Sequence, residues 1–197
     1  MLKKKVLVIV AHPDDETIWM GGLLLRNKNK WDTTLICLCR ESDKDRNPKF
    51  KKACSILGIK GYIFNLDDIK LDKSVNQKLI LNIIKKYSDQ KFDFLFTHNS
   101  NGEYGHIRHI DIHQAVRFVL EKKFIKAKNV FFFNYHKINN NYQGYCVYNS
   151  NADILIKLNS DELSMKKHII KNIYGYQEGG FEEKSCEKIE AFDKFKQ

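Results

Sequence analysis

Proline, glycine-rich linkers and long apolar runs are all scarce in this sequence. Only 2 of the 197 residues are proline and 10 are glycine, whereas 43% are hydrophobic, as is typical of a globular chain. No stretch approaches the roughly 18 consecutive apolar residues that a membrane-spanning helix needs. The basic start at residues 1–5 is too short for a signal peptide, because the apolar run behind it ends in charge. We therefore expect a soluble, cytoplasmic single domain over residues 1–197.

The five cysteines do not form the pattern of a disulfide framework or of a cysteine metal site. Their number is odd, and no Cys-x-x-Cys pair occurs. Cys37 and Cys39 fall in an expected strand at residues 33–39, where small buried thiols are the simpler interpretation. The chain is long enough to bury its core without covalent or metal staples.

Positive charge is in excess. The formal net charge is +10 at pH 7, which raises nucleic acid or an anionic membrane surface as partners. The lysines, however, are scattered along the chain, and acidic residues are interleaved at 41–45 and 178–190. We interpret the charge as a solvated surface and expect no nucleic-acid partner, although a basic face would favour an anionic substrate such as a nucleotide sugar or a phospholipid head group.

Apolar runs alternate with amphipathic segments over most of the chain. The unbroken β-branched run at residues 6–10 is typical of a strand covered on both faces. Further strands are expected at 33–39, 61–64, 93–97 and 130–133, and helices at 17–26, 50–57, 74–87 and 106–122. This order predicts an α/β fold, a Rossmann-like three-layer sandwich with a mostly parallel sheet. Toward the C-terminus we expect a turn-rich stretch at 139–144, antiparallel strands at 145–147 and 153–158, and a helix at 161–174 capped by Ser160.

A polar cluster follows the first strand directly. His12 and Asp15 are separated by a tight turn that Pro13 stiffens, so an imidazole nitrogen and a carboxylate oxygen can converge on one cation. Such mixed ligands suit zinc. Asp14 lies between them, points elsewhere and is free to act as a base. The alternative is an acidic first turn that merely complements the helix dipole.

A second cluster follows the strand at 93–97. Residues 97–113 hold four of the seven histidines of the chain, which is hard to explain as core filling. His106, His109 and His113 are spaced by three and four, so they share one face of a helix beginning near Gly105. His109 and His113 alone have the i, i+4 spacing of helical zinc sites, so from the residues alone His113 stays open as a ligand.

The two clusters together resemble a known family. Ala11-His-Pro-Asp-Asp-Glu16, followed far downstream by Gly105-His-x-x-His109, resembles the PIG-L (LmbE-like) family of metal-dependent N-deacetylases. That family includes N-acetylglucosaminyl-phosphatidylinositol deacetylases and deacetylases of the mycothiol and bacillithiol pathways. The resemblance covers most of the chain and fades after about residue 140.

The resemblance implies a set of roles. The metal ligands would be His12, Asp15 and His109; the ion would be Zn²⁺, with Fe²⁺ or Co²⁺ as alternatives. Asp14 would take a proton from the attacking water, and His106 would stabilise the oxyanion and protonate the leaving amine. For substrate binding, a family tyrosine matches Tyr104, whereas Arg46 is chosen only because it lies in a charged loop on the same sheet edge.

The implied reaction is the removal of an acetyl group from an N-acetylated amino sugar, an N-acetylglucosamine-type conjugate. Two alternatives stay open. One is a hydrolase of a different amide or ester on the same metal scaffold, since a fold determines its substrate poorly. The other is a non-catalytic protein that binds a glycan or nucleic acid. A homo-oligomer is compatible with either.

The second motif departs from its relatives at one position. Many of them have His-Pro-Asp-His, whereas this chain has His106-Ile-Arg-His109. A cation beside the catalytic histidine would lower its pKa, whereas the missing acid would raise it. Asp111 or Glu103 are the candidates to supply the missing charge.

Overall fold

A seven-stranded sheet forms the centre of the molecule. The computed structural model describes residues 2–68, 73–87, 90–138 and 144–195. The sheet order is β3-β2-β1-β4-β5-β9-β8; the first five strands are parallel and the last two antiparallel to their neighbours. These strands are β1 (Lys4–Val10), β2 (Trp31–Cys39), β3 (Lys60–Leu66), β4 (Lys91–Thr97), β5 (Lys126–Phe133), β8 (Ile154–Lys157) and β9 (Ile189–Lys194). The predicted α/β class with a mostly parallel sheet and antiparallel additions is confirmed.

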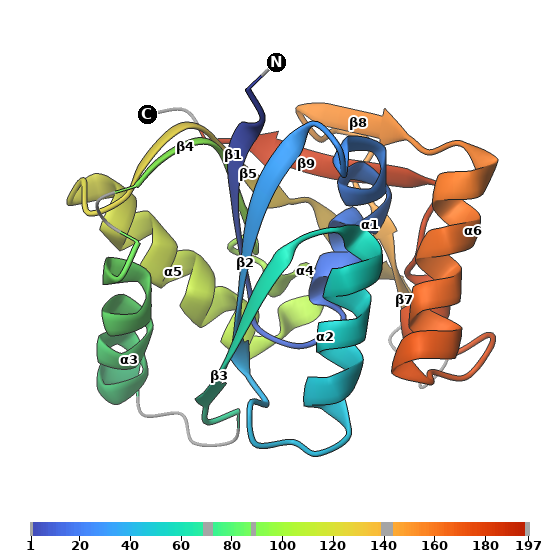
Figure 1. Cartoon of the computed structure of the whole chain (residues 1–197), viewed down its shortest axis with the longest axis horizontal. Helices are drawn as coiled ribbons and strands as arrows, with labels where there is room; N and C mark the ends of the chain where they lie inside the picture. Colours follow the sequence, from blue (N-terminus) through green and yellow to red (C-terminus); the bar gives the residue numbers. More distant parts are fainter. Residues whose placement is uncertain (1, 69–72, 88–89, 139–143, 196–197) are drawn as a thin grey trace.

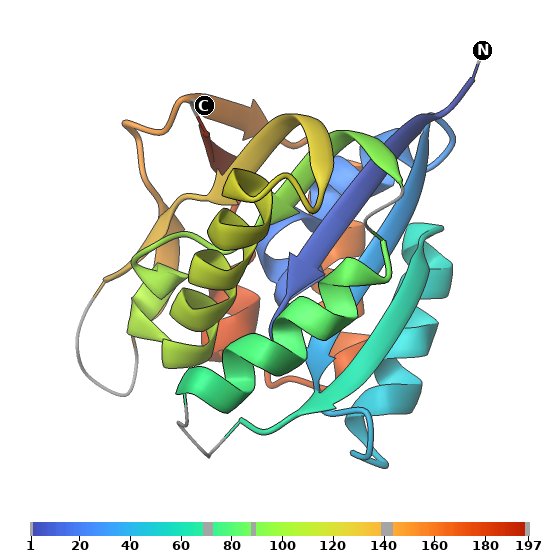
Figure 2. The ribbon, with the colours of Figure 1, turned by 90° about the vertical axis from the view of Figure 1, so that its left-hand side faces the viewer.

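Helices cover both faces of the sheet. In Figure 1, α3 and α5 lie on one side of the sheet, and α1, α2 and α6 on the other. In Figure 2 the side that carries α3 and α5 faces the viewer, and these two helices lie in front of the sheet. The helices are α1 (Asp15–Asn27), α2 (Arg46–Leu57), α3 (Lys73–Lys85), α4 (Gly102–Gly105), α5 (Ile107–Glu121), α6 (Ser160–His168) and α7 (Phe181–Lys184). Among the described residues, none of these helices has the length and apolarity that a bilayer crossing requires.

The core is divided between the two sheet faces by the period of the strands. Val6, Val8 and Val10 of β1 pack toward α1 and α2, whereas Leu7 and Ile9 pack toward α3 and α5, and all five are fully buried. This double burial explains why residues 6–10 of the strand include no polar position. It also explains why its sequence lacks the alternation of a half-exposed strand.

Helix α1 is kinked, and a carboxylate that is distant in the sequence accepts hydrogen bonds from backbone N–H groups beside the kink. Met20 has non-helical backbone angles, φ −149° and ψ 17°. The buried carboxylate of Glu190 in β9 accepts from the backbone N–H groups of Gly22 and Leu23, at 2.8 Å each, and from Lys166 Nζ of α6 at 2.8 Å. One acid therefore joins three elements of the α1 side, and it satisfies donors that would otherwise be buried without partners.

The C-terminal third differs most from the sequence prediction. The last helix does begin where expected, but its cap is Asn159, in a capping box with Glu162, and not Ser160. Its predicted last turns are a π-helix, η1 (Ile169–Tyr174). Strand β9, helix α7 and strand β6 (Tyr135–Ile138) were not predicted. The antiparallel strands predicted at 145–147 and 153–158 are confirmed as β7 (Tyr145–Tyr148), which pairs with β6, and β8. Of the turn predicted at 139–144, residues 139–143 lie outside the described residues.

All five cysteines are free and buried, so the thiols will be inert in the native protein. Burial raises the pKa of Cys39, Cys146 and Cys186 to about 12, and also raises the pKa of Cys37 and Cys54. We expect essentially no reaction with a chromogenic disulfide reagent at neutral pH until the chain is unfolded in guanidinium, when all five thiols react. Rapid reaction of a thiol in the folded protein would contradict this packing.

Candidate active site

The polar clusters meet at the topological switch point of the sheet. Strand β1 leads on to β2 on one side and lies beside β4 on the other, so the crevice opens between the carboxyl ends of β1 and β4. In open α/β sheets this crevice is the usual ligand site. His12, Asp14 and Asp15 follow β1, and His98 follows β4. The fold therefore brings together segments almost 90 residues apart.

The turn after β1 fixes Asp15 from both sides. Its Oδ2 accepts from the backbone N–H of His12 at 2.8 Å, and its Oδ1 accepts from the indole N–H of Trp19 at 2.9 Å. Asp14 has a φ of 118°, an unusual value for a residue with a side chain. This backbone conformation makes the two neighbouring carboxylates diverge, as the tight turn predicted.

The three predicted metal ligands converge on one point. His12 Nδ1 lies 3.5 Å from Asp15 Oδ2, His109 Nε2 lies 3.5 Å from the same oxygen, and the two ring nitrogens are 3.3 Å apart. Ligands about 2.0–2.2 Å from a tetrahedral zinc ion are themselves about 3.3–3.6 Å apart. The spacing of the three atoms thus fits a zinc-sized cation, although their roles as ligands remain a prediction.

Hydrogen bonds on the far side of each imidazole aim its lone pair at this point. His12 Nε2 lies 2.9 Å from Asp68 Oδ1, and His109 Nδ1 lies 2.5 Å from Glu103 Oε2. Because a carboxylate only accepts, each far nitrogen carries a proton, so a neutral imidazole would present the lone pair of its near nitrogen. Carboxylate partners of this kind orient metal-binding histidines in proteins. Two imidazole nitrogens and a carboxylate oxygen that face one another are stabilised by a positive charge between them.

The same charge distribution appears in the pKa of His12. Burial lowers this pKa, but the hydrogen bonds to Asp15 and Asp68 outweigh burial and raise it to about 10. The hydrogen bond from His12 in turn lowers the pKa of Asp68. The site is therefore built to stabilise a cation, whether a proton or a metal ion.

Glu103 is the buried anchor of the second cluster. Its carboxylate contacts His109 Nδ1 and His98 Nδ1, the latter at 2.8 Å, and accepts from the backbone N–H of Asn99 at 2.9 Å. Burial raises its pKa, but His98 and His109 outweigh burial and bring the pKa down to about 2. Sequence reasoning considered Glu103 as a partner for His106, whereas the structure pairs it with two other histidines.

His98 and His113 lie near the metal position and have hydrogen-bond partners of their own. The ring of His98 stacks on His109 with centroids 3.8 Å apart, but its Nε2 accepts from the Ala11 N–H at 3.0 Å and its Nδ1 faces Glu103. Both nitrogens are thus engaged. His113, which the spacing left open as a ligand, lies 3.0 Å by its Nδ1 from the His98 carbonyl and packs on Phe132. It has a packing position behind the site.

His106 begins α5 as its cap. Its Nδ1 accepts from the Arg108 N–H at 3.2 Å, which leaves the proton on Nε2. Burial lowers the pKa of His106 to about 4, together with the nearby His109 and His12. The ring faces His12 edge-on, with centroids 4.7 Å apart. A neutral histidine with an N–H donor therefore lies beside the metal position.

Arg108, the residue that replaces the acid of many relatives, has partners other than His106. The Arg108 guanidinium is buried; it donates to Asp111 at 2.9 Å and also to the carbonyl of Asp67. Asp111 therefore pairs with Arg108, and Glu103, the other candidate for the missing acid, pairs with His98 and His109. The low pKa of His106 arises from burial and neighbouring imidazoles.

A tyrosine from the C-terminal third completes the environment of Asp14. Asp14 Oδ2 accepts from Tyr176 Oη and lies 3.3 Å from Arg46 Nη1, while Arg46 stacks over the Tyr176 ring at 4.6 Å. Burial and the charge of Asp15 raise the pKa of Asp14 well above its usual range. A raised pKa suits a residue that must both take and return a proton. Sequence reasoning found Arg46 but missed Tyr176, which is 162 positions from Asp14.

These groups surround a polar cavity of about 220 Å³. The residues that line it include Tyr104, His106, Arg46, Tyr176 and Glu182. The ring of Tyr104 lies 5.5 Å from that of His106. The volume suits a small polar ligand. All the residues predicted for catalysis, metal binding and substrate binding lie in or directly beneath this cavity.

Removing the Tyr176 hydroxyl tests its contact with Asp14. We expect Tyr176→Phe to lower kcat about tenfold, because a hydrogen bond to a charged group contributes about 1.5–3 kcal/mol and Arg46 remains in place. Steady-state kinetics would measure the change. The exposed Tyr62 of β3 provides the matched control, Tyr62→Phe, and equal rates for the two variants would contradict a role for Tyr176.

The fold is shared by several solved structures. The conserved protein TT1542 from Thermus thermophilus aligns with a TM-score of 0.72 and 17% identity over 96% of this chain and 94% of its own. GalB, the 4-carboxy-2-hydroxymuconate hydratase from Pseudomonas putida KT2440, aligns with a TM-score of 0.68 and 15% identity over 98% and 97%. The A40926 pseudoaglycone deacetylase Dbv21 aligns with a TM-score of 0.65 and 12% identity over 88% and 83%. These likenesses define the class of α/β fold.

The sequence comparison defines the family. The family model described as PIG-L, GlcNAc-PI de-N-acetylase, matches residues 7–120, and the chain belongs to this family. A curated relative, uncharacterized protein L374 of Acanthamoeba polyphaga mimivirus, is 28% identical over 124 residues. That match covers 54% of this chain and 54% of the relative, so the chain spans about half the length of the curated relative that it matches.

Proposed function

We propose that this protein is a divalent-metal-dependent N-deacetylase that hydrolyses the acetamide of an N-acetylated amino sugar. One observation carries the proposal: lone pairs of His12, Asp15 and His109 converge at zinc-like spacing beside Asp14, in a polar cavity. The family assignment supports the same reaction class. Zinc is the preferred ion, with iron(II) and cobalt as alternatives for this ligand set.

The chain's own residues provide the acid, the base and the oxyanion donor. A metal ion held by His12, Asp15 and His109 would supply Lewis acidity, lowering the pKa of water and polarising a carbonyl. Asp14 takes the proton of the attacking water as its oxygen bonds to the acetamide carbon. The carbonyl oxygen gains negative charge, and the Nε2–H of His106 stabilises it by a hydrogen bond.

The breakdown step returns the same proton. When the C–N bond breaks, Asp14, now a carboxylic acid, donates its proton to the departing nitrogen, and acetate and a free amine result. His106 is the oxyanion donor in this scheme, because its low pKa keeps it neutral. Tyr104 and Arg46 line the cavity beside these groups and are proposed to contact the sugar.

Metal removal and a substrate panel test the proposal. The protein would be stripped with a chelator, reconstituted separately with zinc, iron(II) or cobalt, and assayed for acetate release from N-acetylglucosamine conjugates, N-acetylated amino acids and acetate esters. We expect one metal ion per chain and release only from acetylated amino sugars. Release from another amide or ester would be compatible with the metal site but would show that the substrate class is a different one. A protein that binds no metal after reconstitution would refute the mechanism.

A further inference from the structure

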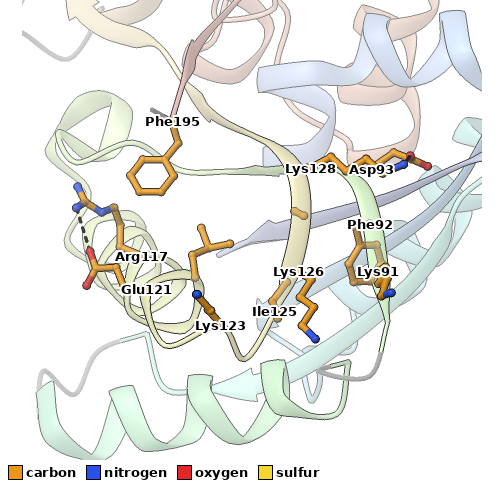
Figure 3. Close-up of a pocket in the computed structure, with 12 residues that line it drawn as sticks. Lys91, Phe92, Asp93, Arg117, Glu121, Lys123, Ile125, Lys126, Lys128 and Phe195 are labelled. Carbon is orange, nitrogen blue, oxygen red and sulfur yellow. Dashed lines mark hydrogen bonds and ion pairs between the residues drawn. The ribbon is translucent and has the colours of Figure 1, made fainter. Parts of the chain in front are cut away.

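A second, larger cavity lies at the opposite end of the sheet from the candidate active site. It has a volume of about 850 Å³ and opens where β4 and β5 begin, at Lys91 and Lys126 (Figure 3). The candidate active site lies where β1 and β4 end, one strand length away. Its volume is within the range of roughly 300–1,000 Å³ that is usual for small-molecule sites. The proposed deacetylation makes no use of it.

The interior of this cavity is hydrocarbon. Phe92, Leu120 and Ile125 form its base and belong to the core on the α3 and α5 side of the sheet. Ala127 adds a small apolar position on β5, and Phe195 closes one wall, as Figure 3 shows. A charged or strongly hydrated ligand gains little from such walls, whereas an alkyl chain gains about 25 cal/mol for each Å² removed from water.

The rim carries an excess of cations. Five basic side chains line the cavity, and two of them are neutralised: Arg117 lies 3.1 Å from Glu121, and Lys128 lies 2.8 Å from Asp93. The other three, Lys91, Lys123 and Lys126, have no acidic partner among the residues that the structure describes. An anionic group at the mouth would therefore find ammonium groups whose charge is not already compensated.

Hydrocarbon walls under a cationic rim select one kind of occupant. Inorganic phosphate would use the lysines and leave the apolar base in water. Nucleic acid requires an extended basic surface that follows a backbone, and gains nothing from an apolar pocket. A membrane surface is broad and would contact the rim without filling the cavity. A single molecule with an alkyl chain and a terminal carboxylate satisfies both halves of the site.

We propose that this cavity binds one molecule of a medium-chain fatty acid, with the alkyl chain against Phe92, Leu120 and Ile125 and the carboxylate at Lys123 and Lys126. Binding here would not require the metal site. The proposal is therefore independent of the proposed deacetylase activity, and each can fail without the other.

Titration calorimetry with decanoate tests the site in the full chain. We expect saturable binding of one decanoate per chain, weakened about tenfold in Lys123→Glu/Lys126→Glu, since two exposed ion pairs are lost and reversed. Ala127→Trp, which fills the cavity and keeps every rim charge, should weaken binding by a similar factor. Thermal melting of each variant would establish that it is folded.

The matched control reverses two lysines elsewhere. Lys51 and Lys52 are exposed on α2, and Lys51→Glu/Lys52→Glu should leave decanoate binding unchanged. Equal weakening in that control, or equal affinity for decyltrimethylammonium, would overturn the proposal, because binding would then not depend on the charge of this rim. Preferential binding to vesicles of anionic phospholipid through Lys123 and Lys126 would also overturn it, by making the face a membrane contact.

Discussion

Asp14→Asn is expected to lower kcat about a thousandfold while the metal content stays at the wild-type level. The carboxylate is the only group in the mechanism that moves a proton, and general acid–base catalysis contributes typically about 10²–10⁴ in rate. Asn tolerates positive φ as Asp does, so the turn at φ 118° is preserved. The contacts from Arg46 and Tyr176 also find an acceptor in the amide. Stopped or coupled assays of acetate release, with metal analysis of the same samples, measure both quantities.

The control for this variant is a nearby acid outside the cavity. Asp45 precedes α2, its side chain is 67% exposed, and it pairs with Lys49. Asp45→Asn should retain full kcat. If Asp14→Asn also kept more than about a tenth of the wild-type kcat, a different residue would have to be the base.

Glu103→Gln is expected to weaken zinc binding about 10- to 100-fold and to destabilise the fold by about 1–3 kcal/mol. The carboxylate faces the imidazole nitrogens of His98 and His109 and the N–H of Asn99. A glutamine offers only one acceptor oxygen, and its NH₂ group would face a donor. His109 would then lose the partner that fixes its tautomer and aims Nε2 at the metal.

Competition with a chromophoric chelator would give the metal affinity, and urea unfolding of the metal-free protein would give the stability. Glu182 lines the cavity but contacts none of the predicted ligands among the described interactions, so Glu182→Gln is the control for metal binding. Unchanged zinc affinity in Glu103→Gln would show that the orientation of His109 does not depend on this carboxylate. A loss of stability without a loss of affinity would assign Glu103 to the fold alone.

The central strands were predictable because their sequence follows directly from their burial. Strand β1 is covered on both faces, so residues 6–10 are uniformly apolar, and the polar residues that follow mark the end of the strand. Strand β9 carries the opposite signal. Glu190 lies within it and is fully buried against Lys166, a partner 24 positions away. A charge in the sequence indicates exposure, so the strand was missed.

The candidate site was predictable where neighbouring residues build it. His12, Asp14 and Asp15 occupy one turn, and His106 and His109 lie at the start of one helix. Spacing and family resemblance together were therefore sufficient to select them as candidate site residues. The supporting groups come from distant segments: Asp68 from the end of β3 and Tyr176 from beyond η1. Neither has a local pattern. Glu103 did have one, a carboxylate inside the histidine-rich segment, but only the fold shows which histidines it contacts.

The backbone conformation at Asp14 lowers the stability of the fold at a residue that we propose for catalysis. A side chain at φ 118° costs of order 1–3 kcal/mol, and glycine adopts this conformation without that cost. The carboxylate adds a second penalty, because it is buried beside Asp15. Asp14→Gly should therefore melt at a higher temperature than the native chain, as differential scanning calorimetry can establish, and be inactive. A designer who optimised this sequence for heat resistance alone would therefore replace Asp14, the proposed base, among the first residues.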